Sequence, residues 1–204
     1  VAETCPAQFN HKYRLKTVET EQHSSNKVGT VSHEILEHRL GGTDAKVARD
    51  RALEKNPLMD SELEDLRALG DAIEAFLKRF DGFCKKNGVT EVLREVEWGI
   101  TAEGKPTGFF AKDVYFRGKV DLGAITASRE LVVVDHKSGV ATDITRKDKF
   151  KTQLNSYAVL AALNVEGLTG VRGGINFLQG PEDKRIQWLD FLDTDRIKRL
   201  YVPW

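Results

Sequence analysis

The amino-acid sequence predicts a mixed α/β domain, because helical and strand patterns follow one another as one sheet covered by helices would require. Residues 27–40, 44–56 and 58–87 carry apolar side chains at helical spacing. Strand patterns then dominate the chain, and one further helical pattern covers 150–164 between them. The expected order is therefore helices, strand, hairpin, helix, strand, strand, and 204 residues suit a single domain of this kind.

The early helical region has marked boundaries and one strongly apolar face. Gly41 and Gly42 end the helix at 27–40, and Asn56 with Pro57 separates the two helices that follow. The later of these helices carries an apolar stripe that suits packing against a core. The stripe comprises Leu63, Leu66, Leu69, Ile73, Phe76, Leu77 and Phe80.

The strands differ in how strongly the sequence marks them. A β-branched run, Val132 to Val134, is typical of a strand buried on both faces. Residues 127–130 form the turn of a hairpin before it, and Asp193 is placed to cap a short helix that ends at Leu200. The expected strands cover residues 92–100, 114–125, 131–136, 175–179 and 187–191.

The composition excludes several classes of protein. The 31 basic and 31 acidic residues give zero formal net charge, which argues against a histone-like polycation but leaves local DNA-binding surfaces open. The longest apolar run, Tyr157 to Leu163, is too short to span a membrane, and the polar N-terminal segment predicts no secretory signal. The two cysteines, Cys5 and Cys84, suit a reducing cytoplasm and are too few for a four-cysteine zinc or iron–sulfur site.

Two patterns that look like known sites fail on spacing. His33 and His38 are five residues apart, whereas a zinc-protease helix needs its two histidines four residues apart on one face. Gly104-Lys105 and Gly118-Lys119 lack the upstream glycine and the following Ser or Thr of a phosphate-binding loop. We therefore expect no ATP site in this chain.

The strongest chemical signal flanks the predicted hairpin turn. Asp135 and Lys137 are two residues apart at the end of a strand, so they share a face. Asp121 lies on the preceding strand, where alternation puts Val120 and Leu122 together on the opposite face. Asp121 shares the face of Asp135 only if the connection has an odd number of residues or a bulge intervenes, and the sequence leaves this open.

Two carboxylates and a lysine at one sheet edge suit the hydrolysis of a phosphodiester. Carboxylates are hard oxygen ligands for Mg²⁺ or Mn²⁺. A lysine beside them can neutralise charge on a phosphate or orient an attacking water. An isolated Asp-x-Lys pair is more often a solvated strand end, so the interpretation depends on further residues.

Three further features add to this pattern, although each alone is also typical of ordinary structure. Gln153 and Tyr157 share one face of a helix, which alone suggests the polar rim of an amphipathic helix. His33, on the first helix, could supply an imidazole ligand or border the core. Glu95 and Glu97 share a strand face that could equally face solvent.

The order of these motifs resembles the RecB-type branch of the PD-(D/E)XK nuclease superfamily. That family usually carries Asp-Tyr-Lys-Thr-Gly after an apolar strand, and here the segment Asp135-His136-Lys137-Ser138-Gly139 follows one. The other motifs keep the family's order, namely Gly29 to His33, Glu95, and Gly118 to Asp121 before this segment and Gln153 to Tyr157 after it. The resemblance implies a restriction-endonuclease-like core, with a central mixed β-sheet flanked by helices and an N-terminal helical region. It also implies one nuclease domain over residues 1–204 with a helical insertion at about 41–90.

The resemblance assigns roles to individual residues. Lys137 is expected to be the catalytic lysine, and Glu95 an accessory glutamate for which Glu97 competes. Gln153 and Tyr157 are expected to steady the site and contact DNA. The expected ligands of one or two Mg²⁺ or Mn²⁺ ions are His33, Asp121, Asp135 and the main-chain carbonyl of His136.

The N-terminal Cys5-Pro6 resembles a Cys-Pro segment of the family. In cluster-bearing relatives this cysteine is one of four iron–sulfur ligands, and the other three follow the Gln–Tyr helix. This chain has no cysteine after Cys84. The sequence therefore predicts no iron–sulfur cluster and a packing role for Cys5.

The expected function is a metal-dependent DNA nuclease, foremost an exonuclease in DNA repair, recombination or phage DNA processing. The alternatives are a structure-specific endonuclease, or a non-cleaving DNA-binding or assembly domain that retains the nuclease fold. The expected partners are single- or double-stranded DNA and a recombination protein or helicase, with no membrane and a cytoplasmic location. The charges predict a basic track beside the carboxylates and an acidic back formed by the helical stretch around 54–65. The basic side chains are Arg146, Lys147, Lys149 and Lys151, together with Arg117 and Lys119 near Asp121.

Overall fold

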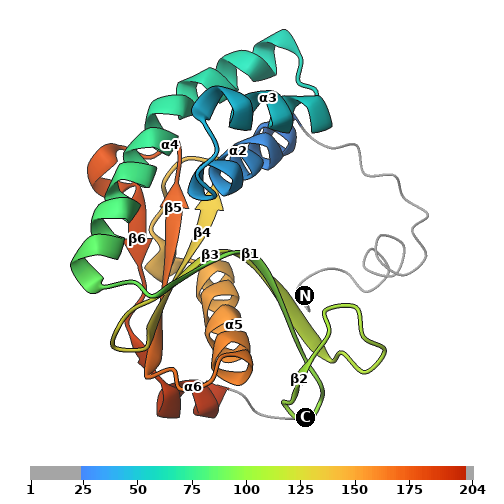
Figure 1. Ribbon diagram of the computed structural model, residues 1–204, viewed down its shortest axis with the longest axis vertical. Coiled ribbons are helices and arrows are strands. Elements are labelled where there is room, and N and C mark those ends of the chain that lie inside the picture. The colour runs from blue at the N-terminus through green and yellow to red at the C-terminus, as the bar shows by residue number, and fades with distance from the viewer. Residues whose placement is uncertain (1–23, 201–204) are drawn as a thin grey trace.

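The computed structural model describes residues 24–200, which build one mixed sheet between two layers of helices (Figure 1). The sheet follows the order β2-β1-β3-β4-β5-β6, and β7 pairs with β5. β4 and β5 run parallel, and the other described strand pairs are antiparallel. The strands are β1 (Glu91–Ile100), β2 (Pro106–Thr107), β3 (Phe116–Ile125), β4 (Glu130–Lys137), β5 (Gly170–Phe177), β6 (Ile186–Trp188) and β7 (Leu192–Asp193). The helices are α2 (Ser24–Leu40), α3 (Ala45–Lys55), α4 (Asp60–Asn87), α5 (Asp148–Asn164) and α6 (Thr194–Leu200), with 3₁₀ turns η2 (Ile144–Arg146) and η3 (Glu182–Lys184).

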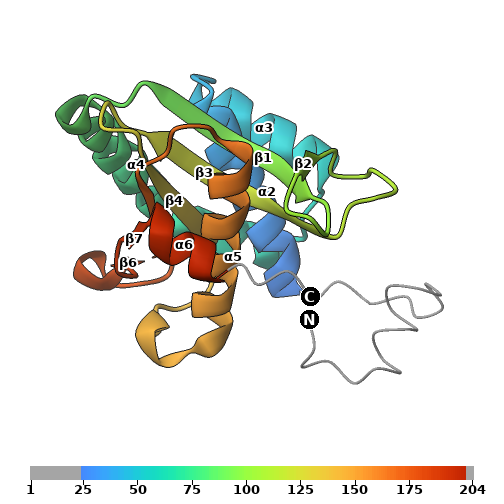
Figure 2. The ribbon, with the colours of Figure 1, turned by 90° about the horizontal axis from the view of Figure 1, so that it is seen from below.

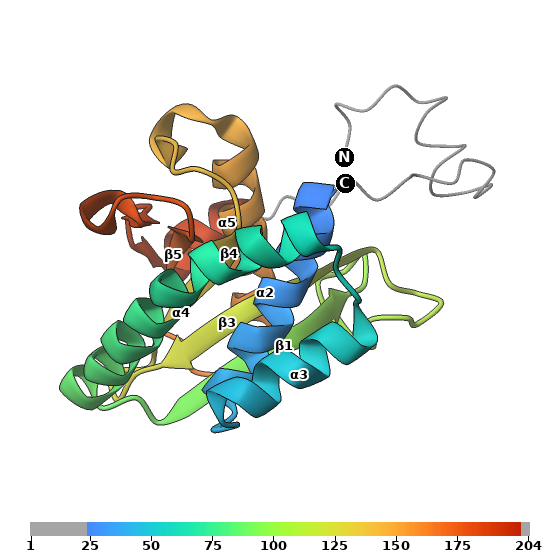
Figure 3. The same ribbon diagram turned by 90° about the horizontal axis from the view of Figure 1, so that it is seen from above.

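The helices divide between the two faces of the sheet. Helices α2, α3 and α4 lie over one face, whereas α5 and α6 lie over the other (Figures 2 and 3). Each layer has its own hydrophobic cluster. Ile125 and Val133 pack into the cluster on the α5 side, and Leu122 and Val134 pack into the cluster on the α2–α4 side. β4 is thus buried on both faces, as its β-branched run predicts.

The predicted fold class and the predicted helices are confirmed. The four long helices lie within two residues of their expected ends, apart from α2, which begins three residues earlier, at Ser24. The stripe on α4 buries Leu66, Leu69, Ile73 and Phe76 in one cluster with α2 and the sheet. That residues 41–90 form an insertion within a single domain stays a prediction. Cys5 lies outside the described residues.

The last strands were predicted less well. β5 begins at Gly170 rather than at residue 175, and the expected strand at 187–191 is wrong, because β6 ends at Trp188 and β7 covers two later residues. Glycines weaken the strand signal in this segment. They are there because other parts of the chain approach the backbone closely. A Cβ on Gly173 would lie 2.9 Å from Cβ of Leu154 in α5, and one on Gly174 would lie 2.5 Å from the Trp188 ring.

None of the helices within residues 24–200 combines the length and apolar character that crossing a membrane demands.

Two alanine substitutions of glycine should change stability in opposite directions. Gly173→Ala should lower the free energy of unfolding by about 1–3 kcal/mol, because the new methyl group would press on the backbone end of Leu154. Gly82→Ala, inside α4 with nothing within 4 Å of its Cβ position, should raise it by about 0.5–1 kcal/mol. Urea unfolding of the two variants measures both. A Gly173→Ala variant as stable as the wild type would contradict the close packing of α5 on β5.

Candidate active site

The site lies where β3 and β4 separate. Their ladder runs from the pair Ile125–Leu131 to the pair Leu122–Val134. One step further, the backbone N–H of His136 donates to Oδ2 of Asp121 at 2.8 Å instead of to a backbone carbonyl. The connection from Ile125 to Leu131 spans residues 126–130, five in number, so the condition of an odd connection is met. This count places Asp121 opposite Asp135, and both carboxylates border the gap between the strands. The expected shared face is nevertheless not kept, because Asp121 turns to His33 of α2 whereas Asp135 contacts α5.

The pairing of β1 with β3 is interrupted at the same level. Arg94 pairs with Leu122 and Val96 with Val120, and the described ladder skips Glu95 and Asp121 between them. Glu95 has a φ of 47°, a left-handed conformation that is unfavourable for a side chain with a Cβ and that clusters at functional sites. The interruption turns the Glu95 side chain toward α2, where it lies with His33 and Asp121.

This interruption corrects one expectation about β3. Alternation predicts that Val120 and Leu122 share a face, but Val120 packs in the α5-side cluster and Leu122 in the α2–α4-side cluster. The irregularity at Asp121 shifts the alternation, so two successive residues of the strand point toward α2. A single sequence does not reveal such an irregularity, because the residues on either side still alternate.

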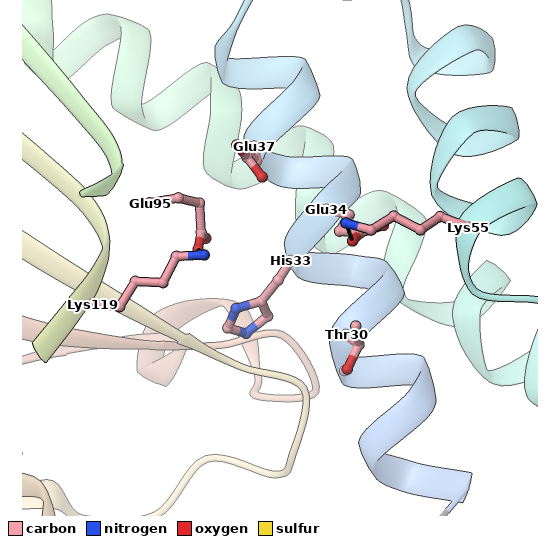
Figure 4. Close-up of a pocket in the computed structure, with 8 residues that line it drawn as sticks. Thr30, His33, Glu34, Glu37, Lys55, Glu95 and Lys119 are labelled. Atoms are coloured by element: carbon pink, nitrogen blue, oxygen red, sulfur yellow. Dashed lines mark hydrogen bonds and ion pairs between the residues drawn. The ribbon is translucent and has the colours of Figure 1, made fainter. Parts of the chain in front are cut away.

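His33, Glu95 and Asp121 bring their ligand atoms together. One donor atom from each residue lies within 4.8 Å of the others, and each residue is partly buried. Figure 4 shows His33 reaching from α2 toward the strands, where Glu95 and Lys119 approach from the other side. α2 can lie this close because Gly29, one turn before His33, has no side chain: a Cβ there would be 3.0 Å from Oγ of Ser138.

The hydrogen bonds of His33 suit a cation between these groups. Nε2 lies 2.8 Å from the carbonyl oxygen of His136, so this nitrogen carries the proton. In the neutral ring Nδ1 then presents a lone pair, and it faces Oδ2 of Asp121 at 3.4 Å. Imidazole nitrogen and carboxylate oxygen both suit a divalent cation such as Mn²⁺, and carboxylate oxygen suits Mg²⁺. The donor set fits the metal that the sequence predicts.

Charge is poorly balanced around Asp121. Burial and the nearby Asp135 carboxylate raise the pKa of Asp121 to about 6, against the opposing effects of His33 and the His136 N–H. Glu95, by contrast, has its own cation, since Lys119 Nζ lies 2.9 Å from its Oε2. The hydrogen bond to Glu95 raises the pKa of Lys119. Lys119 was not among the predicted site residues, although its position two residues before Asp121 is a usable signal.

Asp135 belongs to a second group of contacts on the α5 side. Its Oδ1 accepts hydrogen bonds from Nε2 of Gln153 at 2.7 Å and from the Tyr157 hydroxyl at 3.4 Å. Gln153 also donates to the Tyr157 oxygen at 2.9 Å, so the predicted shared face is present. Oδ2 of Asp135 lies 2.5 Å from Nζ of Lys137. Burial, followed by the Asp135 charge, raises the pKa of Tyr157, which keeps its hydroxyl protonated as a donor.

The three-donor group differs from the predicted ligand set. Glu95, expected as an accessory residue, is in the three-donor group, and its competitor Glu97 is not. Asp135 lies next to that group, with its oxygens engaged by Lys137 and the α5 side chains. The His136 carbonyl lies at the site because it accepts from His33. Ligand roles for His33, Asp121, Asp135 and the His136 carbonyl stay predictions, as does the accessory role of Glu95.

The side chain of His136 points away from this donor group, into the α2–α4 layer. It is 2% exposed, and Nδ1 lies 3.0 Å from Nδ2 of Asn176 on β5. Its ring meets Phe76 of α4 edge-on, with centroids 4.7 Å apart. Burial, followed by the charges of His33 and Lys137, lowers the pKa of His136 to about 3, so the ring is neutral. Asn176 was not predicted as a site residue, because it lies in a glycine-rich strand that is far from His136 in the sequence.

Comparisons with known proteins agree with this geometry. The sequence model of the PD-(D/E)XK nuclease superfamily matches residues 1–197. The chain therefore belongs to the PD-(D/E)XK nuclease superfamily. A search of curated proteins found no match.

Two solved structures add to the comparison. A protein from Eubacterium rectale, described as a "putative exonuclease", has a TM-score of 0.56 and 13% identity, over 96% of this chain and 68% of that chain. At 13% identity, this similarity is evidence for a similar fold alone. The protein SSO0001 is 17% identical over 98% of this chain and 85% of that chain, with a TM-score of 0.33.

Membership of the superfamily supports a nuclease that uses divalent metal and acts on DNA. The three donors His33, Glu95 and Asp121 are a possible site for that metal in this chain.

Without metal, Asp121→Asn should make the protein more stable at neutral pH. The folded state raises the pKa of Asp121 from 3.8 to about 6, so ionisation of this group lowers stability as the pH rises through about 6. The variant keeps an oxygen for the His136 N–H and loses the charge. We expect a gain on the order of 1–3 kcal/mol in EDTA at pH 7.5, which disappears below about pH 4.

Urea unfolding at several pH values measures this difference. Added Mn²⁺ should stabilise the wild type and leave Asp121→Asn nearly unchanged, because only the wild type offers the full donor set. A variant that is less stable than the wild type in EDTA at pH 7.5 would rule out carboxylate repulsion as a feature of the metal-free site.

Proposed function

We propose that this chain is a metal-dependent DNA exonuclease of the RecB-type branch. The observation that carries the proposal is the gap between β3 and β4, where Asp121, Asp135 and Lys137 meet beside the donors His33 and Glu95. The exonuclease assignment draws support from the family's order of motifs. The similar fold from Eubacterium rectale, described as a putative exonuclease, agrees with it.

The proposed chemistry is hydrolysis of a phosphodiester by water. A bound Mg²⁺ or Mn²⁺ ion would neutralise charge on the phosphate and make water a better nucleophile. His33, Glu95 and Asp121 would hold this cation, with Asp135 and the His136 carbonyl at its border. The side chain of Lys137 is 35% exposed and held by Asp135, so its ammonium group can orient the water or stabilise charge on the phosphate.

The residues of α5 have a positioning role in this proposal. Gln153 and Tyr157 fix one oxygen of Asp135, and Asp135 in turn fixes Lys137. The proposed setting is DNA repair, recombination or phage DNA processing in the cytoplasm, with a recombination protein or helicase as partner. The proposed unit is one domain with residues 41–90 as a helical insertion.

Cleavage of end-labelled linear DNA with Mg²⁺ or Mn²⁺, against EDTA, tests the activity. Lys137→Ala should reduce the rate on the order of 100-fold or more, because a charge at the phosphate is lost, and should leave the fold intact. Lys198→Ala, an exposed lysine on α6, is the matched control and should cleave normally. Cutting of closed circular DNA would overturn the exonuclease assignment. Full activity of Lys137→Ala in pure protein would overturn the role of this lysine.

Glu95 and Glu97 of β1 provide a matched pair of variants for the metal site. Glu95→Gln should weaken Mn²⁺ binding by at least the roughly 10-fold that loss of an outer partner of a metal site causes. Glu97→Gln, exposed and two residues later on the same strand, should have little effect. Calorimetric titration with Mn²⁺ compares them directly. Equal affinities of the two variants would remove Glu95 from the ligand set.

A further inference from the structure

A groove runs away from the metal site between β3 and α5. It has a volume of about 550 Å³, and its lining includes three cations, Arg117, Lys119 and Lys149, together with the hydroxyls of Thr152 and Ser156. None of the described residues that line it is acidic. This charge suits the phosphates of a nucleic-acid strand.

The groove and the metal site are continuous. The cavity beside His33, about 320 Å³ in volume, contains Glu34, Glu37 and Glu95, and Lys119 lines both this cavity and the groove. Gln153 and Tyr157, which hold Asp135, line the groove as well. A strand in the groove therefore leads directly to the carboxylates.

Arg117, which lines the groove, forms a cluster with two aromatic rings. The guanidinium carbon of Arg117 lies 4.9 Å from the ring centroid of Phe109 and 5.3 Å from that of Phe110. Arg117 also donates to the Phe109 carbonyl at 2.9 Å, which fixes the arginine over the rings. The two rings meet edge-on with centroids 4.9 Å apart. We call Phe109, Phe110 and Arg117 the aromatic cluster.

Phe110 is 78% exposed, so most of its ring is open to solvent while it contacts Phe109 and Arg117. The loop that carries it, between β2 and β3, projects beyond the sheet (Figure 3). An exposed ring in contact with an arginine that lines a cationic groove is suited to stacking on an unpaired base. Paired bases stay within their own stack and leave such a ring unused.

We propose that the aromatic cluster is a stacking site for an unpaired base of the DNA strand that occupies the groove. The proposal rests on the proposed function, because it takes the strand in the groove to be the substrate. It makes single-stranded DNA, or the frayed end of a duplex, the form in which the substrate reaches the carboxylates. Phe110 would contribute base-dependent affinity, and Arg117 and Lys149 would contribute affinity for phosphates.

Binding of two labelled oligonucleotides of equal length and charge tests the proposal. One is a thymidine strand and the other an abasic strand, and fluorescence anisotropy in EDTA measures both without cleavage. The wild type should prefer the thymidine strand. Phe110→Ala should weaken binding of that strand roughly 5- to 100-fold and leave binding of the abasic strand unchanged. Phe110→Trp should retain the preference, and its indole fluorescence should be quenched by the thymidine strand.

Trp188→Ala is the control for loss of an exposed aromatic side chain, since Trp188 is 41% exposed on β6 and does not line the groove. Equal affinity of the wild type for both strands, or equal weakening of both by Phe110→Ala, would overturn the stacking site. The cleavage assay on end-labelled DNA separates this result from the nuclease assignment. Base preference without cleavage would support the stacking site alone, and cleavage without base preference would support the nuclease alone.

Discussion

The hydrogen bond from the His136 backbone N–H to the Asp121 carboxylate is the contact on which the site depends. In a continuous ladder that N–H would pair with a backbone carbonyl. Here a side chain takes its place, so the strands separate and a carboxylate enters the gap. The same residue presents its carbonyl to His33 of α2 and its ring to Asn176 of β5. β4 thereby links the metal donors to both the sheet and the helical layer, and the low pKa of the ring keeps this buried link free of charge.

The balance of charge explains why a cation belongs beside Asp121 in particular. Three carboxylates crowd this region, and two of them have an ammonium group within 3 Å: Lys119 for Glu95 and Lys137 for Asp135. Asp121 has the imidazole of His33 and one backbone N–H. Burial, followed by the Asp135 charge, raises the pKa of Asp121, and the imidazole and the N–H offset this rise only in part. A divalent ion would relieve the deficit, so without metal the rest of the fold must outweigh the repulsion between these carboxylates.

The sequence predicted the layers of this fold better than the details of the site. Helical periodicity and the valine run of β4 reflect which side chains are buried, and this pattern is visible in a single sequence. From the sequence, a shared face for Asp121 and Asp135 required either an odd number of residues between β3 and β4 or a bulge, and the sequence did not decide between them. The irregularity at Glu95 could not be predicted from the sequence, because it depends on how β1 and β3 pair. Asn176 could not be predicted from the sequence for a similar reason. Its role comes from the parallel pairing of β4 with β5, and no local pattern encodes which strand lies next to which.

Although the formal net charge is zero, acidic and basic side chains are separated between two neighbouring cavities. Acidic side chains gather in the cavity beside His33, and cations line the adjoining groove, with Lys119 at the border of both. A phosphodiester drawn along the groove would meet repulsion at the carboxylates unless a cation were already there. In the proposed function, binding of DNA at the carboxylates and binding of metal would therefore be coupled. Because such coupling is reciprocal, a strand that reaches the carboxylates would also tighten the binding of metal to His33, Glu95 and Asp121.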